Sequence, residues 1–235
     1  MNHLKPYYER ENIVLYNCDC LELLSGMDAG SVDLCLTDPP YGIGEDGGDK
    51  KRRRHYNAVV IHERMGWDKE RPAPQIFKLI FQISREQVIC GANYFSDLLP
   101  ASMGWIYWDK RMGGDFSDGE LIFTSQKKAL RRVDISVFAG LHGGHKRQHP
   151  TQKPVALIEY LIGRFPQAQT ILDPFTGSGT TGVACVRLGR KFIGCEISEK
   201  YCEIAARRID DELNKGRLFE PQDLAQPAKQ EAFVL

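Results

Sequence analysis

Two turns in this sequence carry residue types that could do chemistry together, and the first is Asp38-Pro39-Pro40-Tyr41. Each proline fixes its own φ and restricts the residue before it, so the turn is rigid. It can hold the Asp38 carboxylate and the Pro39 carbonyl oxygen as adjacent acceptors beside the flat Tyr41 ring. Accepting both N–H hydrogens of a planar amine favours a pyramidal nitrogen whose lone pair is free to attack. The turn is a candidate site for activating an exocyclic base amine; the other interpretation is a tight turn that only closes a strand.

The second turn is rich in glycine. Gly177-Ser178-Gly179-Thr180-Thr181-Gly182 fits the pattern G-x-G-x-x-G between an expected strand and an expected helix, and Glu196 follows Gly177 by 19 residues. Glycines let the backbone approach a ligand closely, and an acid at this spacing can accept hydrogen bonds from ribose hydroxyls. The pattern predicts a nucleoside-type cofactor; the alternative is a purely structural turn.

The residues just before the glycines discriminate between cofactors. The run Asp173-Pro174-Phe175-Thr176 places a carboxylate at the carboxyl end of the preceding strand. That charge would repel a pyrophosphate and attract a cationic ligand. S-adenosylmethionine has a sulfonium, an ammonium and a ribose but no phosphate, so it suits the turn better than NAD.

The elements that must position these turns alternate along the chain. We expect strands at Ile13 to Asn17, Val32 to Thr37, Val88 to Cys90, Trp105 to Trp108, Leu121 to Phe123, Val133 to Phe138, Thr170 to Leu172 and Lys191 to Glu196. We expect helices after Asp19, over Pro74 to Arg85, around Phe95 to Leu99 as a single turn, from Pro154 to Ile162, over Thr180 to Leu188 and from Ser198 to about Leu213. This alternation predicts an α/β fold with a largely parallel sheet in a single domain, residues 1–235.

The order of the elements is unusual for a nucleotide-binding fold. Only 53 residues follow Gly182, enough for a helix, a strand and another helix. The rest of the sheet must therefore come from residues before the cofactor turn, as if the ring of elements had been cut at another place. Residues 42–68 lack periodicity, which predicts a mobile loop beside the first turn, and residues 216–235 are expected to be a frayed tail.

Composition sets further limits. Lys plus Arg and Asp plus Glu both number 31, giving a formal net charge of +0, so bulk charge gives no sign of nucleic acid. The seven cysteines form no metal-binding ladder, and we expect reduced thiols and no metal site. The polar N-terminus is unlike a signal peptide, and no apolar run is long enough to cross a membrane. We expect a cytoplasmic protein with no membrane partner.

Together the two turns resemble the catalytic and cofactor motifs of the S-adenosylmethionine-dependent DNA amino-methyltransferases, which modify adenine N6 or cytosine N4. The similarity is to the permuted β-type group, in which Asp-Pro-Pro-Tyr comes first, and it covers about Ile13 to Leu213. The matching stretches are Asp38 to Tyr41, Leu172 to Thr181, Phe192 to Glu196, Gly91 to Phe95 and His149 to Pro154. The resemblance implies a Rossmann-like, seven-stranded sheet, a flipped target base and stacking of that base on Tyr41.

The resemblance also implies how the cofactor is held. Asp19 matches the family position whose acid contacts the adenine of the cofactor, although Asp19 is equally a good helix cap. The predicted S-adenosylmethionine-binding residues are Asp19, Asp173, Pro174, Phe175, Thr176, Gly177, Ser178, Gly179, Thr180 and Glu196.

Contacts with double-stranded DNA are predicted in three basic clusters, each of which could instead be a solvated loop. Their members are Lys51, Arg52, Arg53, Arg54, Lys127, Lys128, Arg131, Arg132, Lys146 and Arg147. The target-recognition segment of the family corresponds to about residues 126–148 and is short here. A short recognition site, help from the 42–68 loop or a second subunit in a homodimer would each account for that.

The resemblance implies adenine as the target base: Thr37 before the catalytic motif favours it, because the family's cytosine enzymes more often have Ser-Pro-Pro-Tyr. Cytosine N4 is the alternative, followed by an RNA or protein amide methyltransferase and by a non-catalytic DNA-binding regulator on the same fold. A cognate restriction enzyme is a further expected partner.

Overall fold

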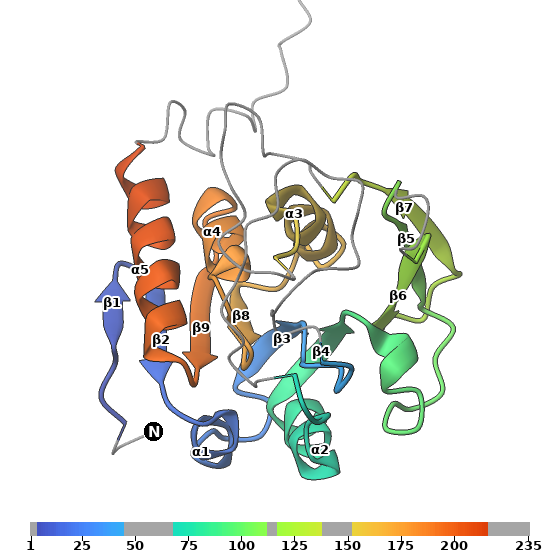
Figure 1. The fold of residues 1–235 in the computed structure, drawn as a ribbon, viewed down its shortest axis with the longest axis horizontal. Coiled ribbons are helices and arrows are strands. Elements are labelled where there is room, and N and C mark those ends of the chain that lie inside the picture. Colours follow the sequence, from blue (N-terminus) through green and yellow to red (C-terminus); the bar gives the residue numbers. More distant parts are fainter. Residues whose placement is uncertain (1–3, 45–67, 112–116, 138–151, 216–235) are drawn as a thin grey trace, which may run out of the picture.

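The computed structural model describes residues 4–44, 68–111, 117–137 and 152–215. Nine strands in these residues form one sheet in the order β1-β2-β9-β8-β3-β4-β6-β5-β7 (Figure 1). The strands are β1 Tyr8–Arg10, β2 Ile13–Asn17, β3 Val32–Thr37, β4 Ser84–Ile89, β5 Ile106–Asp109, β6 Gly119–Thr124, β7 Arg131–Asp134, β8 Thr170–Asp173 and β9 Lys191–Glu196. The helices are α1 Cys20–Ser25, α2 Pro74–Ile83, the 3-10 turn η1 Ala92–Tyr94, α3 Val155–Gly163, α4 Thr180–Arg187 and α5 Glu199–Asn214.

The sheet brings late strands between early ones. Strands β2, β9, β8, β3 and β4 are parallel neighbours, whereas β1, β6 and β5 add antiparallel pairs. Strand β8 pairs directly with β3, with Leu34 opposite Ile171 and Cys35 opposite Leu172. Because these two strands run parallel, their carboxyl ends meet at the same edge of the sheet. The predicted α/β fold with reversed motif order is confirmed.

Helices cover both faces of the sheet (Figure 1). Helices α3, α4 and α5 pack side by side on one face, and α1 and α2 pack together on the other. The sequence of β3 shows why, because it contributes apolar residues to both cores. Leu34 and Leu36 belong to the core under α3, α4 and α5, while Val32 and Cys35 belong to the core over α1 and α2. A strand buried on both faces is a continuous apolar run.

Several expected boundaries are wrong. The resemblance implies seven strands and the sequence patterns predict eight, whereas the described residues form nine; the strand that was not predicted is β1, an antiparallel edge strand from the polar N-terminal segment. The helical turn expected at Phe95 to Leu99 occurs earlier, as η1. The strand expected at Val133 to Phe138 begins at Arg131 instead. Only Val133 of this edge strand points inward, so its exposed charged residues hid the strand from hydrophobic periodicity.

Some predictions fall largely outside the described residues. These are most of the 42–68 loop, much of the 126–148 segment and the 216–235 tail, together with Lys51, Arg52, Arg53, Arg54, Lys146 and Arg147. Of the helices in the described part of the chain, none has the length and apolar character needed to span a membrane.

Candidate active site

A buried carboxylate joins the two turns. Asp173, at the end of β8, is 3% exposed. Its Oδ1 accepts a hydrogen bond of 2.8 Å from the Thr37 hydroxyl at the end of β3, and its Oδ2 accepts one of 2.6 Å from Thr181 in α4. Burial raises the pKa of Asp173 to about 6, although the hydroxyls of Thr181 and Thr37 oppose the rise. The Asp173 carboxylate therefore links the end of β3 to the glycine turn.

The glycine turn is fixed from behind by α5. Gly179 has φ of 82°, and a Cβ at this position would lie 2.8 Å from the Cα of Ala205. Arg208 of the same helix donates to the carbonyl oxygen of Ser178, to its hydroxyl at 2.9 Å and to the Thr180 hydroxyl at 3.3 Å. Burial lowers the pKa of Arg208 to about 10. Arg208 has no place in the sequence motifs, and sequence reasoning missed it.

Two further acids lie beside the glycine turn. Glu196 ends β9 and accepts hydrogen bonds from the backbone N–H of Gly177 at 2.9 Å and of Ser198 at 2.8 Å. Burial raises the pKa of Glu196, and these backbone donors oppose the rise. Asp19 caps α1 by accepting a hydrogen bond of 2.7 Å from the backbone N–H of Leu21. Its capping role is confirmed, and its carboxylate also lies beside the cavity described next.

One cavity of about 300 Å³ contains residues from both turns. The first turn contributes Asp38 and Pro40, and Asp19 and Glu196 lie at its other walls. From the second turn it is lined by Asp173, Pro174, Phe175, Thr176, Gly177, Ser178 and Thr180. Of the predicted catalytic and cofactor-binding residues, Pro39, Tyr41 and Gly179 do not line it. Its four carboxylates suit a cationic ligand with ribose hydroxyls, and its apolar walls, including Phe175 and Ile197, suit a flat purine.

The first turn is surrounded by charges that sequence reasoning did not assign. The Lys153 Nζ lies 2.6 Å from the Asp38 Oδ2, 2.9 Å from the Tyr41 hydroxyl and 3.3 Å from the Glu120 Oε1. The Tyr41 hydroxyl lies 2.6 Å from the Asp38 Oδ1 and 3.1 Å from the Glu120 Oε1. The Glu120 Oε2 in turn lies 3.0 Å from the Lys110 Nζ. We call Asp38, Tyr41, Glu120, Lys153 and Lys110 the clamp network.

The inner members of the clamp network are buried and charged. Lys153 and Glu120 are 8% and 4% exposed, whereas Asp38 is 24% exposed. Burial lowers the pKa of Lys153, but the carboxylates of Asp38 and Glu120 outweigh it and raise the pKa overall. Burial also raises the pKa of Asp38, opposed by Lys153, while Lys153 and Lys110 lower the pKa of Glu120 against its burial. The ammonium groups compensate the buried carboxylates.

The Tyr41 ring packs against a second ring and a glycine. It stacks on Tyr94 with ring centroids 4.5 Å apart and planes 14° apart. Gly91 has φ of 61°, and a Cβ there would lie 2.2 Å from a Tyr41 ring carbon. Gly91 also donates its backbone N–H to the Glu120 Oε1 at 3.0 Å. These contacts give a structural reason for the Gly91 to Phe95 stretch that resembles the family.

The signals for the missed residues were present but weak. Glu120 is a charged residue at an inward position of the otherwise apolar strand β6. Lys153 belongs to the His149 to Pro154 stretch, whose resemblance carried no role for the lysine. In both cases the meaning of the residue depends on a partner more than 30 positions away in the sequence.

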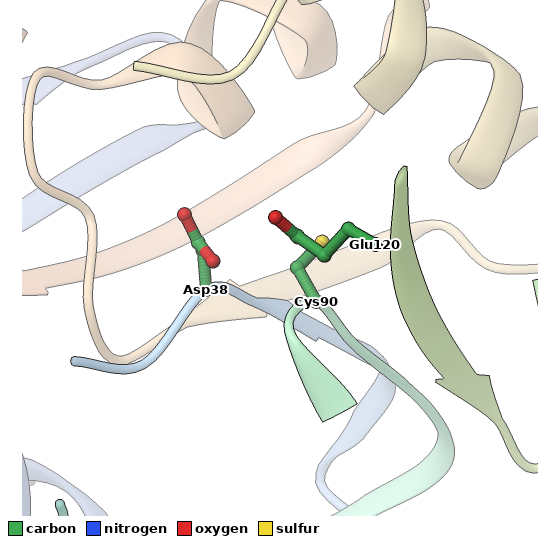
Figure 2. Close-up of side chains that lie close together, drawn as sticks. All are labelled: Asp38, Cys90 and Glu120. Carbon is green, nitrogen blue, oxygen red and sulfur yellow. The ribbon is translucent and has the colours of Figure 1, made fainter. Parts of the chain in front are cut away.

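Three side chains of the site could resemble a metal centre. One ligand atom each of Asp38, Cys90 and Glu120 lies within 4.8 Å of the others (Figure 2). The Lys153 ammonium already approaches both carboxylates, and burial raises the pKa of the Cys90 thiol well above its usual range. We interpret the group as an ion-pair network, because a protonated thiol is a poor metal ligand.

The middle basic cluster divides in two. Lys127, Lys128 and Arg131 are exposed, and among the described residues no carboxylate lies within 4 Å of them. Arg132 instead lies 2.6 Å from the Asp109 carboxylate across β5 and β7. Arg131 and Arg132 lie in strand β7, so the interpretation of this cluster as a loop is wrong for these two residues. The charge of Arg132 is also already paired.

Comparisons with known proteins agree on the family. The sequence model of the family N6_N4_Mtase, a DNA methylase, matches residues 82–207. The type II methyltransferase M2.LlaDCHI of Lactococcus lactis subsp. cremoris is 30% identical, over 92% of this chain and 94% of that protein. The DNA adenine methyltransferase YhdJ of Escherichia coli (strain K12) is 48% identical over 63 residues, 26% of this chain and 21% of that protein.

Solved structures share the fold. The M1.HpyAVI–SAM complex has a TM-score of 0.54 and 22% identity, covering 84% of this chain and 99% of that one. The cytosine-N4-specific PvuII DNA methyltransferase has a TM-score of 0.59 and 18% identity, covering 91% and 95%. With a family match over half of its length and a full-length relative, this chain belongs to the DNA methylases of the N6/N4 family, enzymes that transfer methyl groups from S-adenosylmethionine to amino groups in DNA.

Proposed function

We propose that this enzyme methylates adenine N6 in a specific DNA sequence after flipping the target base out of the duplex. The observation that carries the proposal is the position of the two turns. They follow the adjacent parallel strands β3 and β8, are joined by the hydrogen bond between Thr37 and Asp173, and line one cavity. An amine held at Asp38 and a cofactor held at the glycine turn would therefore share one space.

The cofactor half of the cavity is proposed to hold S-adenosylmethionine. Asp173 and its turn would attract the cationic groups, Glu196 would accept hydrogen bonds from the ribose, and Asp19 would contact the adenine. The cavity also has the residues of the glycine turn that lie within reach of a ligand, namely Pro174, Phe175, Thr176, Gly177, Ser178 and Thr180. Gly179 would act indirectly, by allowing the turn to pack on α5.

The amine half is proposed to carry the chemistry. Bound S-adenosylmethionine supplies an electrophilic methyl group. Asp38 and the Pro39 carbonyl oxygen would accept the two N–H hydrogens of the target amine, so that the nitrogen lone pair points at the methyl carbon. Methyl transfer would form the nitrogen–carbon bond as the methyl–sulfur bond breaks, leaving S-adenosylhomocysteine, and the surplus proton of the methylated nitrogen would pass to the Asp38 carboxylate and then to water. Tyr41, held by Tyr94 and Gly91, would stack with the flipped base.

Adenine is favoured over cytosine by the Asp38 form of the motif and by the local identity to a DNA adenine methyltransferase. The fold is shared with a cytosine-N4 enzyme, so cytosine is the second candidate.

DNA binding is proposed to use Lys127, Lys128 and Arg131 as phosphate contacts, with Lys51 to Arg54, Lys146 and Arg147 as further candidates. Such contacts would offset the few kcal/mol that base extrusion costs. A type II methyltransferase among the relatives supports a cognate restriction enzyme as partner. A homodimer stays a prediction that the mass in solution tests, and the cysteines among the described residues are free thiols, which supports the cytoplasm as the location.

The test offers unmethylated DNA, RNA and protein to the enzyme with S-adenosylmethionine labelled in its methyl group. We expect label in DNA and, after nucleoside digestion, N6-methyladenine. N4-methylcytosine as the product would replace adenine with the second candidate. Label only in RNA or protein would contradict the proposal, as would binding of cofactor and DNA without any transfer.

A further inference from the structure

Two buried charges beside Asp38 have no part in the reaction proposed above. Glu120 lies on β6, outside both turns, and Lys153 lies just before α3. Lys153 contacts Asp38 and Glu120 contacts Tyr41, and both of these partners belong to the first turn. Burying a charge is costly unless it is paired, so their presence next to a reactive carboxylate calls for a function.

The position of the Lys153 ammonium is informative. Its Nζ donates to the Asp38 Oδ2 at 2.6 Å, and both residues line the cavity. An amino nitrogen donating to this oxygen is the contact that the proposed reaction assigns to the target base. In this structure, one of the chain's own amino groups therefore makes the contact expected of the substrate amine.

Glu120 offers the same ammonium a second place. Its Oε1 lies 3.3 Å from the Lys153 Nζ, against 2.6 Å for Asp38, so a small side-chain movement exchanges the nearer partner. Glu120 itself is held in place by the backbone N–H of Gly91 at 3.0 Å and by the Lys110 ammonium at 3.0 Å. A carboxylate held in place this near to the ammonium is suited to receiving the displaced charge.

We propose that Lys153 stands in for the target amine in the free enzyme and that Glu120 is the positioning residue that receives the Lys153 ammonium when the amine binds Asp38. This inference rests on the proposed function. The stand-in keeps the Asp38 carboxylate compensated and aimed while no base is present. Without Glu120, Asp38 is the one carboxylate partner of the ammonium that remains among the described residues, so the ammonium competes with the substrate amine.

The test uses Glu120→Gln, which keeps an acceptor for Gly91 and removes the charge. We expect kcat/KM for DNA to fall roughly 10- to 100-fold, the effect typical of one charge-assisted hydrogen bond, with cofactor affinity within about threefold of the original enzyme. The matched control is Glu159→Gln. The Glu159 carboxylate also lies 3.3 Å from a cation, the Arg187 guanidinium, but this pair joins α3 to α4 outside the clamp network. We expect the control to leave both quantities within about twofold.

The double variant Glu120→Gln with Lys153→Met distinguishes this role from a structural one. It removes one positive and one negative charge, and it frees Asp38 of its competitor. We expect kcat/KM for DNA to recover at least about tenfold over Glu120→Gln alone, because the competing ammonium is gone. Cofactor binding and thermal melting confirm that each variant is folded.

An unchanged kcat/KM in Glu120→Gln overturns the inference, and so does a double variant no better than the single one. These outcomes are separate from the proposed function. If the unaltered enzyme methylates a DNA amine and Asp38→Ala abolishes this, the proposed function holds whatever Glu120 and Lys153 do.

Discussion

The glycine turn and the clamp network lie at the same edge of the sheet, but they are built in different ways. Much of the glycine turn is fixed by backbone: Glu196 accepts from the Gly177 N–H, and Gly179 packs directly on α5. The clamp network is fixed by side-chain charges that four separate segments supply, with Lys153 and Glu120 at its buried centre. The comparison suggests that cofactor binding depends on backbone shape and that methyl transfer depends on electrostatics.

The largest expected effect is on the backbone-built region. In Gly179→Ala, the new Cβ meets the Cα of Ala205 at 2.8 Å, at a φ that favours glycine. We expect the free energy of unfolding to drop by about 2–4 kcal/mol, from strain and overpacking together. Denaturant unfolding measures this.

The control for that variant is Gly163→Ala. Gly163 ends α3, and a Cβ there has nothing within 4 Å, so alanine is expected to be neutral or slightly stabilising. Equal losses in the two variants would mean that the packing of the turn on α5 is not what the glycine serves.

Gly91→Ala makes the same substitution beside Tyr41 of the clamp network. Its Cβ would lie 2.2 Å from the Tyr41 ring, so the ring must move and take its hydroxyl away from Asp38. We expect the methyl-transfer rate to fall about 100-fold while cofactor affinity changes less than about threefold. Single-turnover kinetics and cofactor titration give both numbers, and a loss of cofactor affinity as large as the loss of rate would erase the distinction between the two regions.

Arg208→Ala tests the partly buried arginine behind the glycine turn. It removes the donors to the Ser178 carbonyl oxygen and hydroxyl. We expect KM for S-adenosylmethionine to rise about tenfold with kcat nearly unchanged, since one charge-assisted contact is lost. Arg187→Ala on α4, which removes pairs to Glu159 and Glu212, is the control. A fall in kcat without a change in KM would assign Arg208 to the chemistry instead.

The smallest effect concerns pH. The pKa of Asp173 is raised to about 6 by burial, so protonation below that pH removes a negative charge from the cofactor site. We expect cofactor affinity to be about fourfold weaker at pH 5.5 than at pH 7.5, and Asp173→Asn to weaken this dependence. Isothermal titration at several pH values measures it.

The same raised pKa predicts the sign of one contribution to stability. The folded protein holds this proton more tightly than the unfolded chain, so the contribution of Asp173 falls as the pH rises from about 4 to about 6. For the binding experiment, an affinity for S-adenosylmethionine that increases as the pH drops would contradict the negative charge assigned to Asp173.

How far the sequence predicts the molecule follows the same division. The apolar run of β3, the glycine pattern and the spacing to Glu196 are local, and they predict the fold and the position of both turns. Lys153 and Glu120 carry no local pattern, because their role depends on a sheet that brings positions 38, 120 and 153 together. The bounds of strand β7 were mispredicted for a related reason: Arg131 and Arg132 at its start are exposed, and Arg132 pairs with Asp109 of β5, so apolar alternation does not mark them.

We infer that one cavity has a cofactor half and a separable amine half, and the variant Asp38→Ala distinguishes the two. Cofactor affinity and the single-turnover rate of methyl transfer to DNA are measured on the same sample. Asp33→Ala is the control, because Asp33 lies on β3, the strand that leads to Asp38. Its carboxylate accepts hydrogen bonds from the backbone N–H groups of Gln169 and Thr170, and it does not line the cavity. We expect the affinity of Asp38→Ala for S-adenosylmethionine to be within about fivefold of that of the original enzyme. We expect its rate of methyl transfer to be at least about 100-fold lower. A transfer rate within tenfold of the original would contradict this inference.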